Sequence, residues 1–595
     1  MKNLIPILLT FVVAACLTGC QPNSSGTNGG GGGSTAANTA FEGFENRFID
    51  ALWEQYPGWA IGVGNYKYAD RELRVPNAEN RNADQQFNRR YLDSLNIFDK
   101  EQLSDKNKTD WLMIHDQLES SLWYLDSFKS YEWNPSDYNV ADGFYALLIA
   151  DYSPLEKRLS DMSKRMDNVP AFYAAALQNI QKPTKEHTEL GINQNEGTLA
   201  VFSEIADSLN RSNLSDAEKK DMQRKIEAGK TAVQSYINGL KTYLDKAKKE
   251  GDNKVFRSFR IGKELFAQKF RHDIGSAYTA AQMYEKALAH KQTLHKEMFK
   301  IARSIWQKHM GNLQAPADSL AMLKALIDKI ADKHVKKDSF VQSIRAQIPE
   351  LMAFVNEKKL LDLDPKKPLE VRETPPFMRG VAGASISSPG PYDSNAPTFY
   401  NVTPLDGYSP QKAESYLREY NHYILQILNI HEAIPGHYAQ LVYSNKSPSL
   451  IKAILGNGAM IEGWAVYTER MMLEEGYGNN EPEMWLMYYK WNLRVTCNTI
   501  IDYGIHALDY SQEQVMNILQ NEAFQEQAEA GEKWRRATLT QVQLCSYFSG
   551  FKEIYDFREE LKQKQNANFN LKKFHENFLS YGSAPVKYIK MLMDR

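Results

Sequence analysis

The sequence has few cysteines, 4 in 595 residues. Two of them, Cys16 and Cys20, lie in the first twenty residues, so only Cys497 and Cys545 remain for the rest of the chain. This number excludes the disulfide framework on which many small secreted domains depend. One bridge between Cys497 and Cys545 stays open as an alternative. Both lie in apolar runs of helical character, however, which favours two buried thiols.

An excess of charge of one sign is also lacking, because 71 basic residues face 73 acidic ones and the net charge is −2. This balance excludes a protein whose main partner is a polyelectrolyte, so we expect no nucleic acid partner. After the N-terminal segment no run of 18 apolar residues occurs, and we predict no later membrane-spanning helix. The roughly 555 residues after position 40 are enough for a large core with two or more lobes.

The first 19 residues have the pattern of a signal peptide. Lys2 supplies the positive charge, and the apolar stretch 4–15 is too short to span a membrane as a stable helix. The letters L-T-G-C at residues 17–20 resemble a bacterial lipobox, which predicts cleavage before Cys20 and a lipid on that cysteine. The alternative is an ordinary secretory signal with a chance cysteine.

Residues 20–40 are rich in Gly, Ser, Thr and Asn, a composition typical of a flexible tether. A lipid, a tether and a globular body together suit a protein of the cell envelope that is held to a membrane surface. Gln21 differs from the Asp that resembles an inner-membrane retention signal. We therefore expect a lipid anchor in the outer membrane, facing the periplasm.

The rest of the chain predicts an all-α fold. Residues 41–375 consist mainly of amphipathic patterns, and the Ser215–Glu218 capping box opens one such helix. We expect this region to form one wall of a deep cleft, and residues 376–595 to form the catalytic helical region. Between residues 375 and 410, prolines and glycines are too dense for a helix. Two extended pieces there, 382–386 and 398–402, predict a short sheet near the active site.

The second of these extended pieces contains candidate substrate-binding residues. An edge strand beside a metal site can bind a peptide backbone by strand addition, and Tyr400 and Asn401 are the candidates here. The alternative is a surface connection with no role in binding.

One motif has the residue types of a metal site. Residues 430–440 read I-H-E-A-I-P-G-H-Y-A-Q, so His431 and His437 bracket Glu432 and a Pro-Gly pair. In zinc hydrolases, two imidazoles hold an ion that lowers the pKa of a water molecule, and a glutamate beside the first ring takes the proton. We predict His431 and His437 as ligands and Glu432 as the general base.

The spacing of the two histidines is unusual. Six residues correspond to about 600° of helical rotation, which leaves the rings of a regular helix about 120° apart. Pro435 and Gly436 allow a kink or a bulge that turns His437 back toward His431. The alternative is a helix that ends at the Pro-Gly pair, with both histidines incidental.

A third ligand is expected downstream, where residues 460–472 read M-I-E-G-W-A-V-Y-T-E-R-M-M. Glu462 and Glu469 are seven residues apart and so share one face of an apolar helix. Buried carboxylates are costly unless they are paired or bind a metal. We predict Glu462 as the third ligand of one Zn²⁺ per chain and Glu469 as a partner that orients a histidine ring. The alternative for Glu469 is a buried salt bridge to an arginine.

The motifs H-E-A-I-P-G-H and E-G-W-A-V-Y-T-E resemble the DUF885 family of bacterial proteins, which is related to gluzincin-type zinc peptidases. Three later blocks agree: D-Y-G-I-H-A at 502–507, Q-L-C-S-Y-F-S-G at 543–550 and F-N-L-K-K-F-H-E at 569–576. The similarity covers most of residues 41–595 and is clearest after about residue 375. It implies an all-α fold and metallopeptidase activity.

Further candidates lie on two later helical patterns. Arg494, Asp502 and His506 belong to a polar stripe on an otherwise apolar helix, residues 483–510. We expect Asp502 to accept a hydrogen bond from a metal-binding histidine and His506 to donate to the tetrahedral intermediate. A structural Arg-Asp network is the alternative.

Tyr547 is a second candidate for stabilising the oxyanion, and Arg535 and Arg536 are candidates for binding a substrate carboxylate. An ordinary packed tyrosine is the alternative.

The function predicted from these residues is that of a zinc-dependent peptidase acting on peptides in the cell envelope. A different metal-dependent hydrolase, an amidase or an esterase, would use the same residues. A binding lipoprotein without metal is the third reading, and the intact set of His431, Glu432, His437 and Glu462 argues against it.

Overall fold

The computed structural model describes residues 34–374, 383–393 and 397–594. The predicted signal peptide, Cys20 and the tether as far as residue 33 lie outside them. Within the described part the protein is mainly α-helical, as predicted, and none of its helices combines the length and apolar character of a membrane span. Cys497 and Cys545 are both buried and free.

The first helix begins inside the stretch that we predicted to be a tether. Helix α1 (Thr35–Gln55) starts after Ser34, whose side chain accepts a hydrogen bond from the backbone N–H of Ala37. An N-cap of this kind stabilises a helix start, and Phe41 and Phe44 on α1 are buried in the core. The prediction of a tether up to residue 40 is therefore wrong for residues 35–40, because capping and burial outweigh the polar composition.

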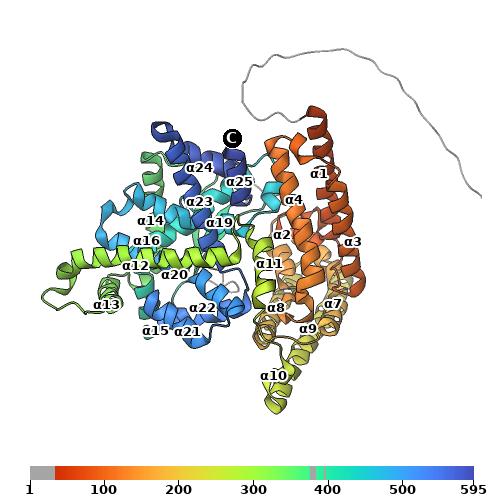
Figure 1. Ribbon diagram of the computed structural model, residues 1–595. Helices are drawn as coiled ribbons and strands as arrows, with labels where there is room; N and C mark the ends of the chain where they lie inside the picture. Colours follow the sequence, from red (N-terminus) through yellow and green to blue (C-terminus); the bar gives the residue numbers. More distant parts are fainter. Residues whose placement is uncertain (1–33, 375–382, 394–396, 595) are drawn as a thin grey trace, which may run out of the picture.

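The N-terminal helices form two groups (Figure 1), and one group has a core of its own. A separate hydrophobic core lies among the residues between Ile61 and Leu240. The helices of the whole N-terminal region, both groups together, are α1, α2 (Pro57–Gly62), α3 (Ala78–Leu95), α4 (Asp105–Trp123), α5 (Ala141–Ile149), α6 (Leu155–Met166), α7 (Val169–Asn179), α8 (Lys185–Arg211), α9 (Asp216–Glu250) and α10 (Asp252–Val255). The predicted capping box of Ser215 and Glu218 opens α9.

The main hydrophobic core joins the two ends of the chain, because it contains both Phe41 and Ile589. Helix α12 (Ala280–Met310) runs across the middle of this body (Figure 1). The predicted division at residue 375 stays a prediction, but the buried core is not divided there. The other central helices are α11 (Gly262–Ile274), α13 (Ser319–Ala331) and α14 (Phe340–Glu357).

The C-terminal helices carry the candidate site. They are α15 (Pro410–Glu419), α16 (His422–Glu432), α17 (His437–Asn445), α18 (Leu450–Ile454), α19 (Gly458–Glu474), α20 (Pro482–Ala507), α21 (Gln512–Asn517), α22 (Gln527–Leu539), α23 (Cys545–Gln565), α24 (Leu571–Ser580) and α25 (Val586–Met593). Helices α19 and α23 cross at Gly463 and Gly550, where a Cβ on Gly463 would lie 2.3 Å from the Cα of Gly550. Only glycine permits so close a crossing at this point.

The Pro/Gly-rich region contributes to a small sheet, as predicted, with one strand more than expected. Strand β2 (Ala384–Ser387) pairs antiparallel with β3 (Thr398–Val402), and β1 (Leu369–Glu373) pairs parallel with the other side of β3. The strand order is β1-β3-β2, so β3 lies in the centre.

Candidate metal centre

The two histidines lie on two separate helices rather than on one kinked or bulged helix. Helix α16 ends at Glu432 and α17 begins at His437. The connection is short and ordered, because the N–H of Gly436 donates to the carbonyl of Ile430 at 3.0 Å. The indole N–H of Trp464 donates to the carbonyl of Pro435 at 2.9 Å. The predicted kink is corrected to a break between two helices, yet the two rings still meet.

Gly436 allows this break through its lack of a side chain. A Cβ at this position would lie 1.9 Å from the carbonyl oxygen of His431 and 2.3 Å from that of Ile430. The backbone at residue 436 therefore packs directly against the last turn of α16. This close approach brings His437, the first residue of α17, next to His431.

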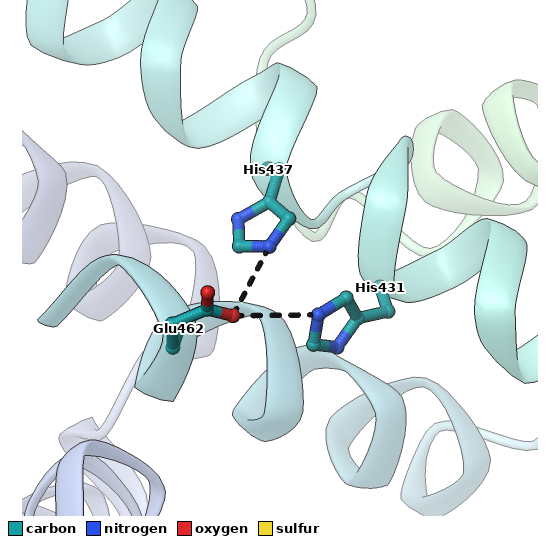
Figure 2. Close-up of side chains that lie close together, drawn as sticks. All are labelled: His431, His437 and Glu462. Carbon is teal, nitrogen blue, oxygen red and sulfur yellow. Dashed lines mark ion pairs between the residues drawn. The ribbon is translucent and has the colours of Figure 1, made fainter. Parts of the chain in front are cut away.

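The rings of both histidines point at one carboxylate on a third helix, as Figure 2 shows. The Nε2 atom of His437 lies 3.4 Å from Oε2 of Glu462, and the Nε2 atom of His431 lies 3.7 Å from the same oxygen. The ring planes are 86° apart with centroids separated by 4.8 Å. Three side chains from α16, α17 and α19 thus converge on one point.

The other nitrogen of His431 is held by a buried carboxylate. Its Nδ1 donates to Oε1 of Glu469 at 2.7 Å, and the indole of Trp491 on α20 donates to the same oxygen at 3.1 Å. A ring that carries its proton on Nδ1 presents the lone pair of Nε2 to a metal. Glu469 thus has the position expected of an orienting partner, and no arginine takes its place among the described residues.

We expect Glu469→Gln to lower the affinity for Zn²⁺ by about 10- to 100-fold, a typical cost of removing an outer partner of a histidine ligand. The amide still accepts a hydrogen bond but no longer raises the basicity of the ring. Competition against a chromophoric zinc chelator measures the change, with Glu475→Gln on the neighbouring turn as the matched control. Equal affinities of the two variants would contradict the assignment.

The charges around the site favour a cation. Burial opposes a charge on His431, but the carboxylates of Glu462 and Glu469 outweigh it and raise the pKa of that ring. Burial also acts on Glu462, yet the two histidines hold its pKa well below the usual range. The space between the two rings and the carboxylate of Glu462 therefore favours a positive charge. A metal ion in that space would supply the charge that a proton supplies in its absence.

These distances fit a zinc ion. In a tetrahedral site with bonds of about 2.0–2.1 Å, two ligand atoms lie about 3.3 Å apart. The ligand atoms of His431, His437 and Glu462 all lie within 4.8 Å of one another, and small shifts bring them to that spacing. Nδ1 of His437 is buried and has no hydrogen-bond partner in the described part of the chain, so packing and the contact of Nε2 with Glu462 orient that ring.

The chain belongs to the DUF885 family. The family model, described as a bacterial protein of unknown function, matches residues 57–593. A solved structure described as a "putative lipoprotein of unknown function" from Shewanella oneidensis is 53% identical, with a TM-score of 0.85 over 93% of this chain and 100% of the other. No curated protein matches the sequence.

A second solved structure, a "putative lipoprotein" from Colwellia psychrerythraea, shares the fold at 16% identity. Its TM-score is 0.75 over 94% of this chain and 98% of the other.

Two candidates on α20 of this DUF885 protein lie elsewhere than predicted. Asp502 accepts hydrogen bonds from the backbone N–H groups of Val542 and Leu544 at 3.2 and 3.1 Å, so it holds the turn before α23 and does not contact a metal-binding histidine. Burial raises its pKa to about 7. His506 is buried and bonded to the carbonyl of Ala537 at 2.9 Å, so it cannot reach a substrate.

The predicted substrate-binding residues of β3 are also corrected. Tyr400 is fully buried and donates to Asn429 at 2.8 Å. Asn401, also fully buried, accepts from Arg372 and donates to Ser387, both at 2.7 Å. Because β1 and β2 occupy both sides of β3, no substrate strand can pair with it.

Arg494 forms a structural ion pair with Glu529 at 2.5 Å. It also donates to the hydroxyl of Tyr420 at 3.4 Å and lies over the ring of Trp491. Arg535 is exposed and its nearest carboxylate partner is Glu532 at 3.9 Å. No hydrogen bond or ion pair within the described residues links it to the candidate site, and its binding of a substrate carboxylate stays a prediction.

Tyr547 and Arg536 are brought together, as Arg536 donates to the hydroxyl of Tyr547 at 3.0 Å. Burial raises the pKa of Tyr547, and the charge of Glu462 adds to this effect. Tyr547 lies one turn before Gly550, where α23 crosses α19 next to Glu462. The pair therefore faces the candidate metal centre.

Two tryptophans whose hydrogen bonds hold the site in place were not identified from the sequence. Trp464 lies two residues after Glu462 within the quoted motif, and Trp491 lies three residues before Arg494. Their indole N–H groups are committed to Pro435 and Glu469. Only the proximity of Trp464 to the motif gave a signal, since a buried indole requires an acceptor.

Proposed function

We propose that this protein is a zinc-dependent peptidase of the cell envelope. The observation that carries the proposal is the convergence of His431, His437 and Glu462 on one point, with the carboxylate of Glu432 close enough for the charges of all three to act on it. The resemblance to gluzincin-type peptidases supports the choice of peptide bonds. A bound Zn²⁺ supplies polarisation of a carbonyl group and activation of water.

Glu432 is the residue that moves the proton. It follows the ligand His431 directly and makes no hydrogen bond or ion pair within the described residues. Burial raises its pKa, so its carboxylate is a stronger base than an exposed glutamate. It accepts a proton from the attacking water and passes it to the leaving amine.

Tyr547 stabilises the charge that develops on the scissile carbonyl oxygen. Its hydroxyl accepts from Arg536 and keeps its own hydrogen to donate. It takes the role that we had also predicted for His506.

The similar structures described as lipoproteins support a lipid anchor on Cys20 of this chain. A lipid there, with residues 21–33 as a tether, holds the body at a membrane surface. We place that surface at the outer membrane, facing the periplasm, because Gln21 follows the cysteine.

The test is to purify the protein, measure its metal content and challenge it with a peptide mixture beside a panel of esters and simple amides. We expect one Zn²⁺ per chain, cleavage of peptides, loss of cleavage with a chelator and recovery when zinc is restored. Cleavage of esters or simple amides alone would replace the peptidase by another hydrolase. A protein that binds no zinc and cleaves nothing would overturn the proposal.

A further inference from the structure

Helix α22 carries a group of two basic side chains, Lys533 and Arg536, and Arg536 is bonded to Tyr547 near the candidate metal centre. Lys533 and Arg536 are three residues apart and so share one face of that helix. Arg536 is half-buried, and its Nη2 donates to Gln543 at 2.8 Å and to Tyr547 at 3.0 Å. Its Nε and Nη1 groups have no hydrogen-bond partner within the described residues. This guanidinium therefore keeps donors for a further ligand.

Lys533 makes no hydrogen bond or ion pair in the described part of the chain. The residue is only 4% exposed, and Glu529 and Glu419 attract it only from beyond ion-pair distance. Burial lowers the pKa of Lys533 to about 7, and the nearby Arg494 acts in the same direction. A buried lysine without a partner is costly, and a bound anion would remove that cost.

The acidic residues nearby are already engaged. Glu529 pairs with Arg494 at 2.5 Å, and Glu419 pairs with Lys490 at 2.7 Å. No carboxylate of the described residues lies within ion-pair distance of Lys533 or Arg536. The group therefore holds one permanent positive charge, on Arg536, and a lysine that a bound anion would keep protonated, and neither has a carboxylate within ion-pair distance in the described part of the chain.

Tyr547 connects this group to the metal centre. It is bonded to Arg536 on one side, and on the other it lies on α23 where that helix meets α19 next to Glu462. Because the charge of Glu462 acts on Tyr547, an anion bound by Arg536 would lie on the Tyr547 side of the candidate metal centre.

We propose that Arg536, with Lys533 behind it, binds a carboxylate of the substrate close to the scissile bond. The inference rests on the proposed peptidase activity and adds a substrate class to it, namely peptides that carry a carboxylate within a residue or two of that bond. The free Nε and Nη1 donors lie on different edges of the guanidinium, so each can donate one charge-assisted hydrogen bond to a carboxylate oxygen. The free C-terminus of a short peptide and an acidic side chain both supply this group.

The experiment compares three randomised tetrapeptide mixtures with the zinc-loaded enzyme: free C-termini, amidated C-termini, and amidated C-termini with Asp or Glu at the last position. We expect the first mixture to be cleaved at least about tenfold faster than the second if the C-terminus is the ligand, and the third to match the first if an acidic side chain serves. Equal rates for all three mixtures would overturn the inference.

Variants separate the subsite from the chemistry. We expect Arg536→Gln to lower kcat/KM for the preferred mixture by about 10- to 100-fold more than for the plain amidated mixture, the loss typical of a charge-assisted hydrogen bond. Lys533→Met, which keeps the buried volume, acts in the same direction. Arg535→Gln on the exposed side of α22 is the matched control.

An equal loss by Arg536→Gln on all mixtures would mean that this residue acts only through Tyr547, which contradicts the subsite. If the protein cleaves no peptide, the proposed function fails, but equilibrium binding of the same mixtures to the zinc-loaded protein still tests the inference. Binding that ignores the carboxylate, or that Arg536→Gln does not change, would overturn it.

Discussion

Glu432→Gln is expected to keep zinc and to abolish peptide cleavage. The amide is nearly isosteric and does not touch the three ligand atoms, but it cannot accept a proton. General acid–base catalysis contributes about 10²- to 10⁴-fold in enzymes, and we expect a loss of kcat in the upper part of that range. Zinc content and initial rates on one preparation measure both effects.

Glu462→Gln is the matched comparison for this result. It makes the same chemical change 30 residues later, at a residue that we assign as a metal ligand. We therefore expect this variant to lose zinc as well as activity. If Glu432→Gln cleaved peptides at the wild-type rate, the general base would have to be another residue. If it lost zinc as Glu462→Gln does, Glu432 would belong to the ligands.

Gly436→Ala is expected to separate the two histidines. The added Cβ would lie 1.9 Å from the carbonyl oxygen of His431, so the start of α17 has to move away from the end of α16. We expect zinc affinity to fall by more than about 100-fold and stability to fall by about 3 kcal/mol, the upper range of overpacking costs. Zinc titration and thermal unfolding measure these two changes.

The control is Gly458→Ala at the first position of α19, where a Cβ meets no heavy atom within 4 Å. We expect zinc affinity and melting temperature to stay close to those of the wild type. Wild-type zinc affinity in Gly436→Ala would show that the histidines do not need the close packing of residue 436.

The sequence predicted those parts of the site that depend on local chemistry. His431, Glu432 and His437 stand in one short motif, and the seven-residue spacing of Glu462 and Glu469 placed both carboxylates on one helix face. The Pro-Gly pair indicated a change of direction. It did not distinguish a bulge from a break between helices, because that difference depends on packing against Trp464.

The predictions that proved wrong concern residues whose roles depend on contacts between distant segments of the chain. The stripe of Arg494, Asp502 and His506 was correctly read as one face of a helix, but periodicity does not say what lies opposite that face. Asp502 meets a turn 40 residues later, where Val542 has a positive φ of 73° and buried backbone N–H groups need an acceptor. Likewise, the strand pattern of residues 398–402 gave no indication that a third strand would cover its free edge.

The burial of Lys452 against Asp110 gives the N-terminal helices a direct influence on this chemistry. The ammonium group of Lys452, on the short helix that follows α17, lies 2.6 Å from a carboxylate on α4, and both side chains are almost inaccessible to solvent. Breaking such a pair by removing one partner leaves an isolated charge in the interior. The helix that begins with His437 is therefore anchored, through α18, to a segment more than 300 residues earlier in the chain, and the C-terminal helices depend on the N-terminal ones for part of their packing.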